Sequence, residues 1–224
     1  WDNPYTTMHY HAEAQIVREL GKFLENGGIY KGHRPVLWSV VEKTALADAE
    51  VEYQDHKSTT IYTCFPIEKS SEPKFSDHSI VIWTTTPWTI PGNRALAVHE
   101  EIEYQSLTIN KNDTNQKVII AKDLIENFIQ ENEISEHTLN FEIKGKELIG
   151  LNCKHPLFDS GYDFTVPVLH GDFVTTEQGT GIVHICPVHG MDDFLLGKQH
   201  NLELPMTIDE GGIYYEHIPV FAGK

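Results

Sequence analysis

The stretch Ser79-Ile80-Val81-Ile82-Trp83-Thr84-Thr85-Thr86-Pro87-Trp88-Thr89 joins a short apolar segment to a run of four hydroxyls and two indoles. The apolar part predicts a strand. The threonines predict a polar pocket wall, because each hydroxyl donates and accepts hydrogen bonds while its methyl group limits the space beside it. A turn at residues 90–94 and a second apolar segment follow, so we expect the threonines at a strand-to-loop corner.

Strand-like segments dominate the chain from Val51 onward. They cover residues 59–67, 79–83, 95–98, 103–109, 117–121, 139–143, 164–168 and 181–185. Apolar residues at helical spacing predict helices at residues 11–25 and 123–131, and a shorter one at 192–200. The chain is therefore expected to form a mixed α/β, strand-rich fold.

Composition narrows the class of protein. The 224 residues include 33 acidic and 17 basic side chains, which give a formal net charge of −16. This balance argues against broad electrostatic binding to nucleic acid or to anionic membranes. No apolar run approaches the ~18 residues that span a bilayer, and the N-terminus has no signal core. We expect a cytoplasmic monomer without a membrane partner, whose three cysteines are reduced thiols.

A second group of reactive side chains lies in residues 179–194. A predicted strand carries His184 and ends at Pro187, and a turn at Gly190 leads into a helix that begins near Asp192 and Asp193. Carboxylates at a helix start commonly cap it, and a single strand histidine is commonly structural. The alternative is that one carboxylate faces a pocket and pairs with a ligand ammonium. The presence of His184, Asp193 and the threonine run in one chain favours a site.

Other chemistries are weaker alternatives. The segments His184-x-Cys186-x-x-His189 and Cys153-x-His155 contain metal-binding side chains. Their spacing matches neither a paired-cysteine zinc site nor the zinc-deaminase pattern, so we predict no metal and no cofactor. A metal-dependent hydrolase and a Cys186 nucleophile stay open as alternatives. The sequence contains no G-x-S-x-G elbow, no phosphate-binding P-loop and no G-x-G-x-x-G run.

Residues 83–95 resemble the threonine-rich motif of isoleucyl-tRNA synthetases, and residues 179–193 are similar to the second motif of their editing domain. Three further segments agree with this family: Trp1-x-x-Pro4-Tyr5-x-Thr7-Met8, Lys31-Gly32-x-Arg34-Pro35-Val36-x-Trp38-Ser39 and Ala45-Leu46-Ala47-x-Ala49-Glu50-Val51-Glu52-Tyr53. The valyl and leucyl enzymes are expected to carry a Thr-Thr-Arg-Pro type motif. Thr86 before Pro87 therefore favours the isoleucine branch.

The resemblance also implies an architecture. The HIGH and KMSKS signatures of the family occur nowhere in the sequence, so the chain resembles the inserted editing domain of a larger synthetase. Such a domain is expected to be a twisted, barrel-like β-sheet core with peripheral helices. We expect residues 1–48 to form a helix and a linker adjoining the synthetase body, residues 49–210 the editing domain, and residues 211–224 the return linker.

The implied activity is hydrolysis of the ester in mischarged Val-tRNA(Ile), with Val-AMP as a second candidate substrate. One methylene changes binding free energy only slightly, and the isoleucyl enzymes are the standard example of this limit, so a second site must remove valine. The implied partners are the 3′ end of aminoacylated tRNA(Ile), its valine ester and the rest of the synthetase in cis. The expected catalytic residues are Thr84, Thr85, Thr86 and Asp193. The expected substrate-binding residues are Trp88, Thr89, Asn93, His184 and Asp193, with Asp193 pairing with the α-ammonium. A module that binds an RNA end without turnover remains the alternative.

Overall fold

The computed structural model describes residues 4–68, 72–111 and 114–224. The chain divides into two compact units, Trp1–Arg34 and Pro35–Lys224. Trp1, which opens one of the segments of the resemblance, lies outside the described residues, as do residues 2–3 of the predicted region 1–48 and residues 69–71 and 112–113. Within the described part, no helix is both long and apolar enough to cross a bilayer.

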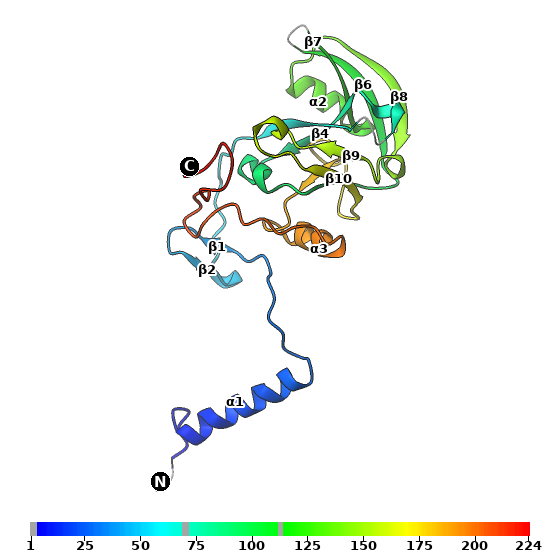
Figure 1. Cartoon of the computed structure of the whole chain (residues 1–224). Coiled ribbons are helices and arrows are strands. Elements are labelled where there is room, and N and C mark those ends of the chain that lie inside the picture. The colour runs from blue at the N-terminus through cyan, green and yellow to red at the C-terminus, as the bar shows by residue number, and fades with distance from the viewer. Residues whose placement is uncertain (1–3, 69–71, 112–113) are drawn as a thin grey trace. The chain divides into compact units, whose positions relative to one another are not determined.

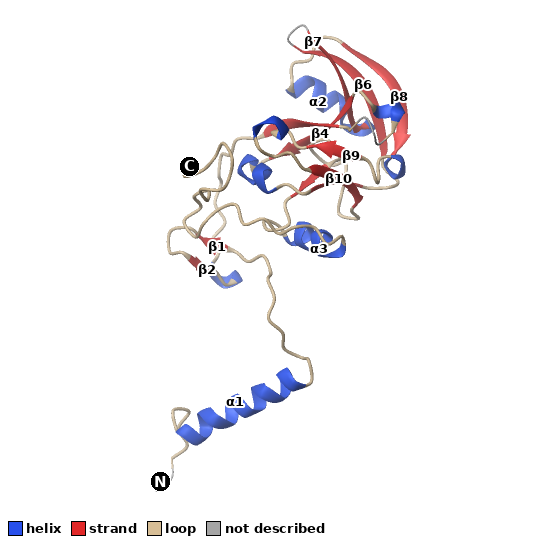
Figure 2. Ribbon diagram, in the orientation of Figure 1, coloured by secondary structure: helices blue, strands red, loops and turns tan. Residues whose placement is uncertain are grey.

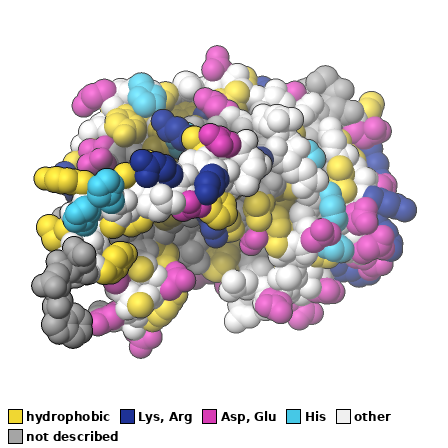
Figure 3. Space-filling model, turned by 90° about the horizontal axis from the view of Figure 1, so that it is seen from below, with side chains coloured by type: hydrophobic (Ala, Val, Ile, Leu, Met, Phe, Trp, Pro, Cys, Tyr) yellow, Lys and Arg dark blue, Asp and Glu magenta, His cyan; other side chains and the backbone are white. Residues whose placement is uncertain are grey.

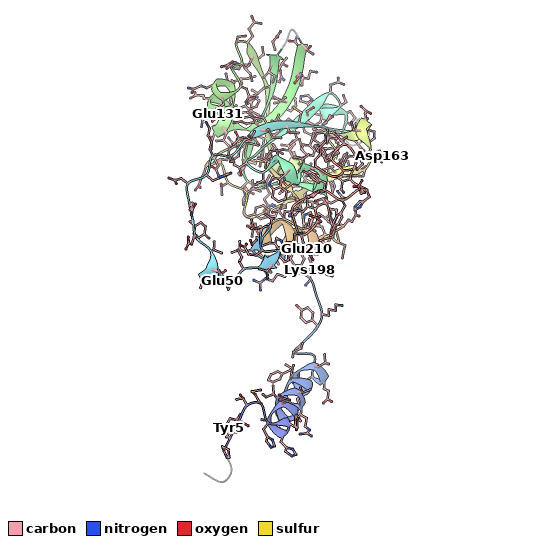
Figure 4. All side chains as sticks on the ribbon, turned by 90° about the vertical axis from the view of Figure 1, so that its left-hand side faces the viewer. Tyr5, Glu50, Glu131, Asp163, Lys198 and Glu210 are labelled. Carbon is pink, nitrogen blue, oxygen red and sulfur yellow. The ribbon has the colours of Figure 1, made fainter. Side chains whose placement is uncertain are left out.

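The first unit consists of one helix and its flanking segments. Helix α1 (Tyr10–Glu25) confirms the helix predicted at residues 11–25. His9 caps it, since the His9 side chain accepts a hydrogen bond from the backbone N–H of His11. The helix ends at Glu25, Asn26 is its C-cap, and Gly27 follows with a φ of +77°. Tyr5 lies in the segment that precedes the helix (Figure 4).

The second unit contains two main sheets (Figures 1 and 2). The five-stranded sheet has the order β3 (Ile61–Pro66), β4 (His78–Thr84), β7 (Thr114–Ala121), β6 (Glu103–Lys111) and β8 (His137–Lys144). The four-stranded sheet has the order β11 (Val183–Ile185), β5 (Ala95–Val98), β10 (Thr165–His170) and β9 (Asn152–Lys154). The pairs β4–β7 and β5–β10 are parallel, and the other pairs in these two sheets are antiparallel. A separate hairpin joins β1 (Trp38–Ser39) to β2 (Thr44–Ala45).

Period-two alternation distributes the apolar side chains between three clusters. On β4, Ile80 and Ile82 enter the cluster between the two sheets, while Val81 points to the other face and packs with Phe128 of helix α2 (Ile125–Glu131). On β5, Leu96 enters the cluster between the sheets, and its neighbours on the opposite face pack with Leu196 of helix α3 (Met191–Gln199). The unit is therefore built of four layers: α2, the five-stranded sheet, the four-stranded sheet and α3. In Figure 4, Glu131 of α2 lies in the upper part of the unit and Lys198 of α3 near its lower end.

The mixed, strand-rich α/β class is confirmed. A bridge between Ile67 and Cys153 links the edges of the two sheets, but the described strands do not close into a barrel. The predicted helices and strands are present with shifted bounds. Sequence patterns missed β1, β2 and β9, because two or three residues are too few to show alternation. They also missed the 3-10 helix Pro87–Gly92, which replaces the expected simple turn.

Gly181 fixes the loop that leads into β11. Its φ of +69° lies in the left-handed region, and a Cβ at this position would lie 2.4 Å from the Cβ of Ala121. The hydroxyl of Tyr104 donates a hydrogen bond of 2.8 Å to the carbonyl of Gly181. The loop is thus held against β7 by close contact, and it brings the residues before β11 to the end of β4.

Charged side chains are mixed on the surface. Figure 3 shows acidic groups spread across the visible face, with basic groups interspersed among them. Five ion pairs of the second unit join exposed lysines or a partly buried arginine to glutamates: Lys74–Glu147, Arg94–Glu203, Lys122–Glu103, Lys122–Glu142 and Lys144–Glu101. Exposed pairs of this kind contribute little to stability, so the core rather than the surface charges holds the fold.

Candidate active site

A cavity of about 350 Å³ lies where the carboxyl end of β4 meets β11 and the start of α3. The lining residues come from four places in the sequence: residues 83–86 with Thr89, then Phe173 and Thr175, then residues 178–184, and finally Cys186, His189 and Asp193. The cavity therefore brings together the threonine run and the second group of reactive side chains, which are about a hundred residues apart in the sequence.

The threonine run forms one wall. Thr84 is the last residue of β4 and is buried, whereas Thr85 and Thr86 are exposed. The hydroxyl of Thr84 accepts a hydrogen bond of 3.1 Å from the backbone N–H of Thr86 and lies 3.3 Å from its hydroxyl. Thr89 is buried in the 3-10 helix, and its hydroxyl donates a 2.8 Å bond to the carbonyl of Thr86. Internal hydrogen bonds thus fix this corner, and the exposed residues Thr85 and Thr86 line the cavity.

His184 lies on β11 with both ring nitrogens engaged. Its Nε2 is 2.7 Å from the hydroxyl of Thr89, and its Nδ1 is 3.2 Å from the side-chain nitrogen of Asn93. Burial lowers the pKa of His184 to about 4, with smaller contributions from His155 and His189. The imidazole is therefore neutral at physiological pH, and it has no free nitrogen with which to act as a base.

Asp193 supplies a carboxylate at the start of α3. Its Oδ1 accepts a 2.7 Å hydrogen bond from the backbone N–H of Cys186. A Cβ on residue 190 would lie 2.4 Å from Asp193 Oδ2, so Gly190 makes room for this carboxylate. Burial raises the pKa of Asp193 to about 6, an effect that its hydrogen bond to Cys186 opposes and the nearby Asp192 reinforces. The carboxyl is still mostly ionised at pH 7, and it lines the cavity as a partly buried negative charge.

Two of the predicted site residues lie off the cavity wall. Trp88 is 44% exposed, and its ring meets that of His189 edge to face at 4.8 Å. The hydroxyl of Tyr214 donates a 2.7 Å hydrogen bond to the carbonyl of Trp88. Trp88 therefore stands at the rim, beside the wall residue His189. Asn93 is completely buried behind His184, so it reaches the cavity only through that side chain.

The metal and thiol alternatives do not fit the described residues. His155 donates from Nε2 to the carbonyl of Ile90 at 3.0 Å and accepts at Nδ1 from the N–H of Leu157 at 3.1 Å, so neither nitrogen is free for a metal. In residues 4–68, 72–111 and 114–224, no three His, Cys, Asp or Glu side chains come together as metal ligands. Burial raises the pKa of the Cys186 thiol to about 12, which leaves almost no thiolate at pH 7.

Several residues that line the cavity were not among the predicted site residues. Phe173, Thr175 and Gln178 come from the segment between β10 and β11, and His189 follows β11. The available signal was the pair of glycines, Gly179 and Gly181, both with positive φ. Glycines that bracket a threonine indicate a tight loop, but they do not say which wall the loop approaches.

The buried imidazoles should make the fold sensitive to acid. His184 and His155 have pKa values of about 4 in the folded chain and near 6.5 when unfolded. Each neutral imidazole therefore stabilises the fold above pH 6.5, and that contribution, roughly 3 kcal/mol, is lost as the pH falls to 4. Asp193 has the opposite effect on stability. Burial of its charged form destabilises the fold above about pH 6, and this destabilisation disappears toward pH 4 as the carboxyl is protonated.

Urea denaturation between pH 7.5 and 4.5 measures this balance. We expect a net loss of stability with acid, a shallower loss in His155→Gln and a steeper loss in Asp193→Asn. An unchanged slope in His155→Gln would contradict the assignment, since that side chain is buried and neutral in the folded chain.

Comparison with known proteins places the chain among aminoacyl-tRNA synthetases. Residues 1–198 match the family model described as tRNA synthetases class I (I, L, M and V). The isoleucine–tRNA ligase of Pelagibacter ubique (strain HTCC1062) is 50% identical over 225 residues, which are 100% of this chain and 25% of that protein. The isoleucine–tRNA ligase of Gluconobacter oxydans (strain 621H) is 47% identical over 231 residues, 100% of this chain and 24% of that protein.

The chain spans about a quarter of the length of these curated relatives. Among solved structures, the crystal structure of GlLeuRS-CP1 is similar with a TM-score of 0.52 and 22% identity, over 63% of this chain and 58% of that chain. At this level of identity the structural likeness concerns the fold alone.

Proposed function

The chain belongs to the class I tRNA synthetases of the I, L, M and V group, and from this membership we propose that it hydrolyses misacylated tRNA. The proposed substrate is the valyl ester on the 3′-terminal ribose of tRNA(Ile), with Val-AMP as a second substrate. The observation that carries the proposal is the cavity of about 350 Å³, which is lined together by the Asp193 carboxylate, the threonine run and the His184 imidazole.

Each feature of the cavity has a counterpart in an aminoacyl ester. The carboxylate of Asp193 lines the cavity. Its proposed role is to pair with the α-ammonium, which distinguishes an aminoacyl ester from an ordinary ester. His184 and Thr89 form a rigid neutral wall that limits the size of the amino-acid side chain. We propose that the hydroxyls of Thr84, Thr85 and Thr86 act on the ester carbonyl and on a water. The backbone N–H of Thr86 already donates to the Thr84 hydroxyl, so it helps to hold this corner.

The proposed reaction is attack by water on the ester carbonyl, without an acyl-enzyme. The His184 nitrogens are engaged and the Cys186 thiol is protonated, so neither supplies a base or a nucleophile at neutral pH. Catalysis then depends on positioning of the water and on donors that stabilise the oxyanion. The neighbouring ribose hydroxyl of the substrate is the proposed route for the proton.

The proposed RNA contact is limited to the 3′ end. Trp88 stands exposed at the rim, where its ring is available to stack on the terminal adenine. The net charge of −16 does not favour binding of the tRNA body. We propose that the remainder of a synthetase holds that body in cis in the cytoplasm, with residues 1–48 and 211–224 as connections to it and residues 49–210 as the editing domain.

Deacylation of purified Val-tRNA(Ile) and Ile-tRNA(Ile) by the chain tests this function. We expect hydrolysis of the valyl ester, little hydrolysis of the isoleucyl ester, and a high apparent KM because the tRNA body has no partner. No hydrolysis of either ester at any tRNA concentration would favour a binding module instead. Efficiency equal to that of a full-length synthetase would contradict the limited RNA contact.

A further inference from the structure

We propose that Asn93 is a positioning residue that holds His184 in one neutral tautomer, with the ring proton on Nε2, and so keeps the cavity wall uncharged. The tautomer follows from hydrogen-bond geometry alone. Its consequence for selectivity rests on the proposed editing function.

The amide orientation of Asn93 is fixed by a backbone carbonyl. The side-chain nitrogen of Asn93 lies 2.9 Å from the carbonyl oxygen of Ala95. A carbonyl oxygen only accepts, so the atom facing it is the NH₂ group and not the amide oxygen. The second proton of the same NH₂ group points to His184 Nδ1 at 3.2 Å. An amide nitrogen only donates, and Nδ1 therefore accepts and carries no proton.

The opposite ring nitrogen completes the assignment. A neutral imidazole with a bare Nδ1 has its proton on Nε2, which lies 2.7 Å from the hydroxyl of Thr89. That hydroxyl has one proton, and it donates this proton to the carbonyl of Thr86 at 2.8 Å. Thr89 therefore accepts from His184. Four hydrogen bonds are thus assigned: Asn93 donates to Ala95 and to His184, His184 donates to Thr89, and Thr89 donates to Thr86. No second arrangement of the protons satisfies all four.

Burial keeps this arrangement closed to solvent. Asn93 is fully buried, Thr89 is 3% exposed and His184 is 9% exposed. Among the described residues, Asn93 Oδ1 has no hydrogen-bond partner, so the amide is held by its nitrogen alone. A buried amide oxygen without a partner costs stability. The contribution of Asn93 to the site is therefore its two N–H donors, to Ala95 and to His184.

A fixed neutral ring has a direct effect on the cavity. With both nitrogens engaged, His184 presents only carbon atoms and its ring face to a ligand, which suits a wall that measures an aliphatic side chain. A positive ring here would repel the α-ammonium that Asp193 is proposed to bind. The titratable groups that face His184 are His155 and His189, whose charges would oppose protonation, while Cys186 and Asp193 line the same cavity.

Long-range ¹H–¹⁵N spectra of the ¹⁵N-histidine-labelled chain test the tautomer, with His184 assigned by its absence in His184→Gln. We expect an unprotonated Nδ1 and a protonated Nε2, with no titration between pH 8 and pH 5. A protonated Nδ1, or a midpoint at or above the ordinary value near 6.5, would overturn the proposal.

The variant Asn93→Asp tests the role of the donor. A carboxylate only accepts, so its contact with His184 requires a proton on Nδ1 and stabilises the imidazolium. The same change removes the donor to the Ala95 carbonyl. We expect the His184 midpoint to rise by two or more pH units, and Val-tRNA(Ile) hydrolysis to fall below that midpoint and recover above it. Asn201→Asp adds the same charge at an exposed position and should leave both measurements unchanged.

The outcomes separate the two proposals. An unchanged His184 titration in folded Asn93→Asp overturns the positioning role. If Asn93→Asp does not fold, the spectrum of the unmodified chain still decides the tautomer. If the chain hydrolyses no ester, the proposed function fails while the tautomer assignment stands or falls on the spectra alone.

Discussion

Asp193→Asn should reduce the hydrolysis of Val-tRNA(Ile) by roughly 30-fold to a few thousand-fold. Asparagine keeps the shape of the side chain and an oxygen for the N–H of Cys186, so the change removes little besides the charge. Removing one partner of a desolvated charge pair costs ~2–5 kcal/mol, and each 1.4 kcal/mol is about tenfold in rate. Single-turnover deacylation at pH 7.5 measures the loss. Asp192→Asn is the matched control, because Asp192 is exposed at the same helix start and its loss should change the rate less than about twofold.

The role of the charge can be separated from a structural role. N-acetyl-valyl-tRNA has no α-ammonium, so the unmodified chain should hydrolyse it poorly and Asp193→Asn should not reduce that rate further. For the natural ester, kcat/KM should fall as the pH drops below about 6, where Asp193 becomes protonated. An equal loss on both substrates in Asp193→Asn would show that the carboxylate acts on something other than the ammonium.

Much of the fold was predictable because its strands are marked either by alternating apolar residues or by short continuous apolar runs. β4 shows why: Ile80 and Ile82 face one core and Val81 the other, so the apolar run is a strand buried on both faces. β9 has only three residues and is defined by its partners β10 and Ile67. Local patterns cannot report such pairing, nor could they show that the two sheets stay open instead of closing into a barrel.

Most residues of the candidate site could be predicted from the sequence, but the hydrogen bonds that join them could not. The threonine run, His184 and Asp193 do line one cavity, and their individual roles remain predictions. The contact between Thr89 and His184 spans 95 residues, and that between Asn93 and His184 spans 91. Distances of this kind depend on β5 lying beside β11, where Leu96 pairs with His184. Asn93, which was expected to bind substrate, therefore lies behind His184 and does not line the cavity.

The second large effect concerns selectivity rather than rate. His184→Ala should allow hydrolysis of Ile-tRNA(Ile), with a gain of roughly tenfold to a hundredfold, while hydrolysis of Val-tRNA(Ile) persists. The imidazole is a rigid part of the wall, since Thr89 holds one nitrogen and Asn93 the other. Forcing an extra methylene into a filled site costs ~1–3 kcal/mol, and removing the ring removes that cost. Deacylation of the two esters by the same preparation gives the ratio.

His184→Gln distinguishes lost volume from lost hydrogen bonds. Glutamine is similar in length and has an Nε2–H₂ group that can donate to Thr89, so it should keep most of the discrimination that alanine loses. If His184→Ala still rejects isoleucine as well as the unmodified chain does, the ring is not the wall that measures the side chain. Thr89 and residues 178–183 then become the remaining candidates, because they line the same cavity. If both variants accept isoleucine equally, the hydrogen bonds of the ring matter more than the volume of the side chain. Glutamine cannot reproduce the contacts to both Thr89 and Asn93, and these two contacts would then set the position of the wall.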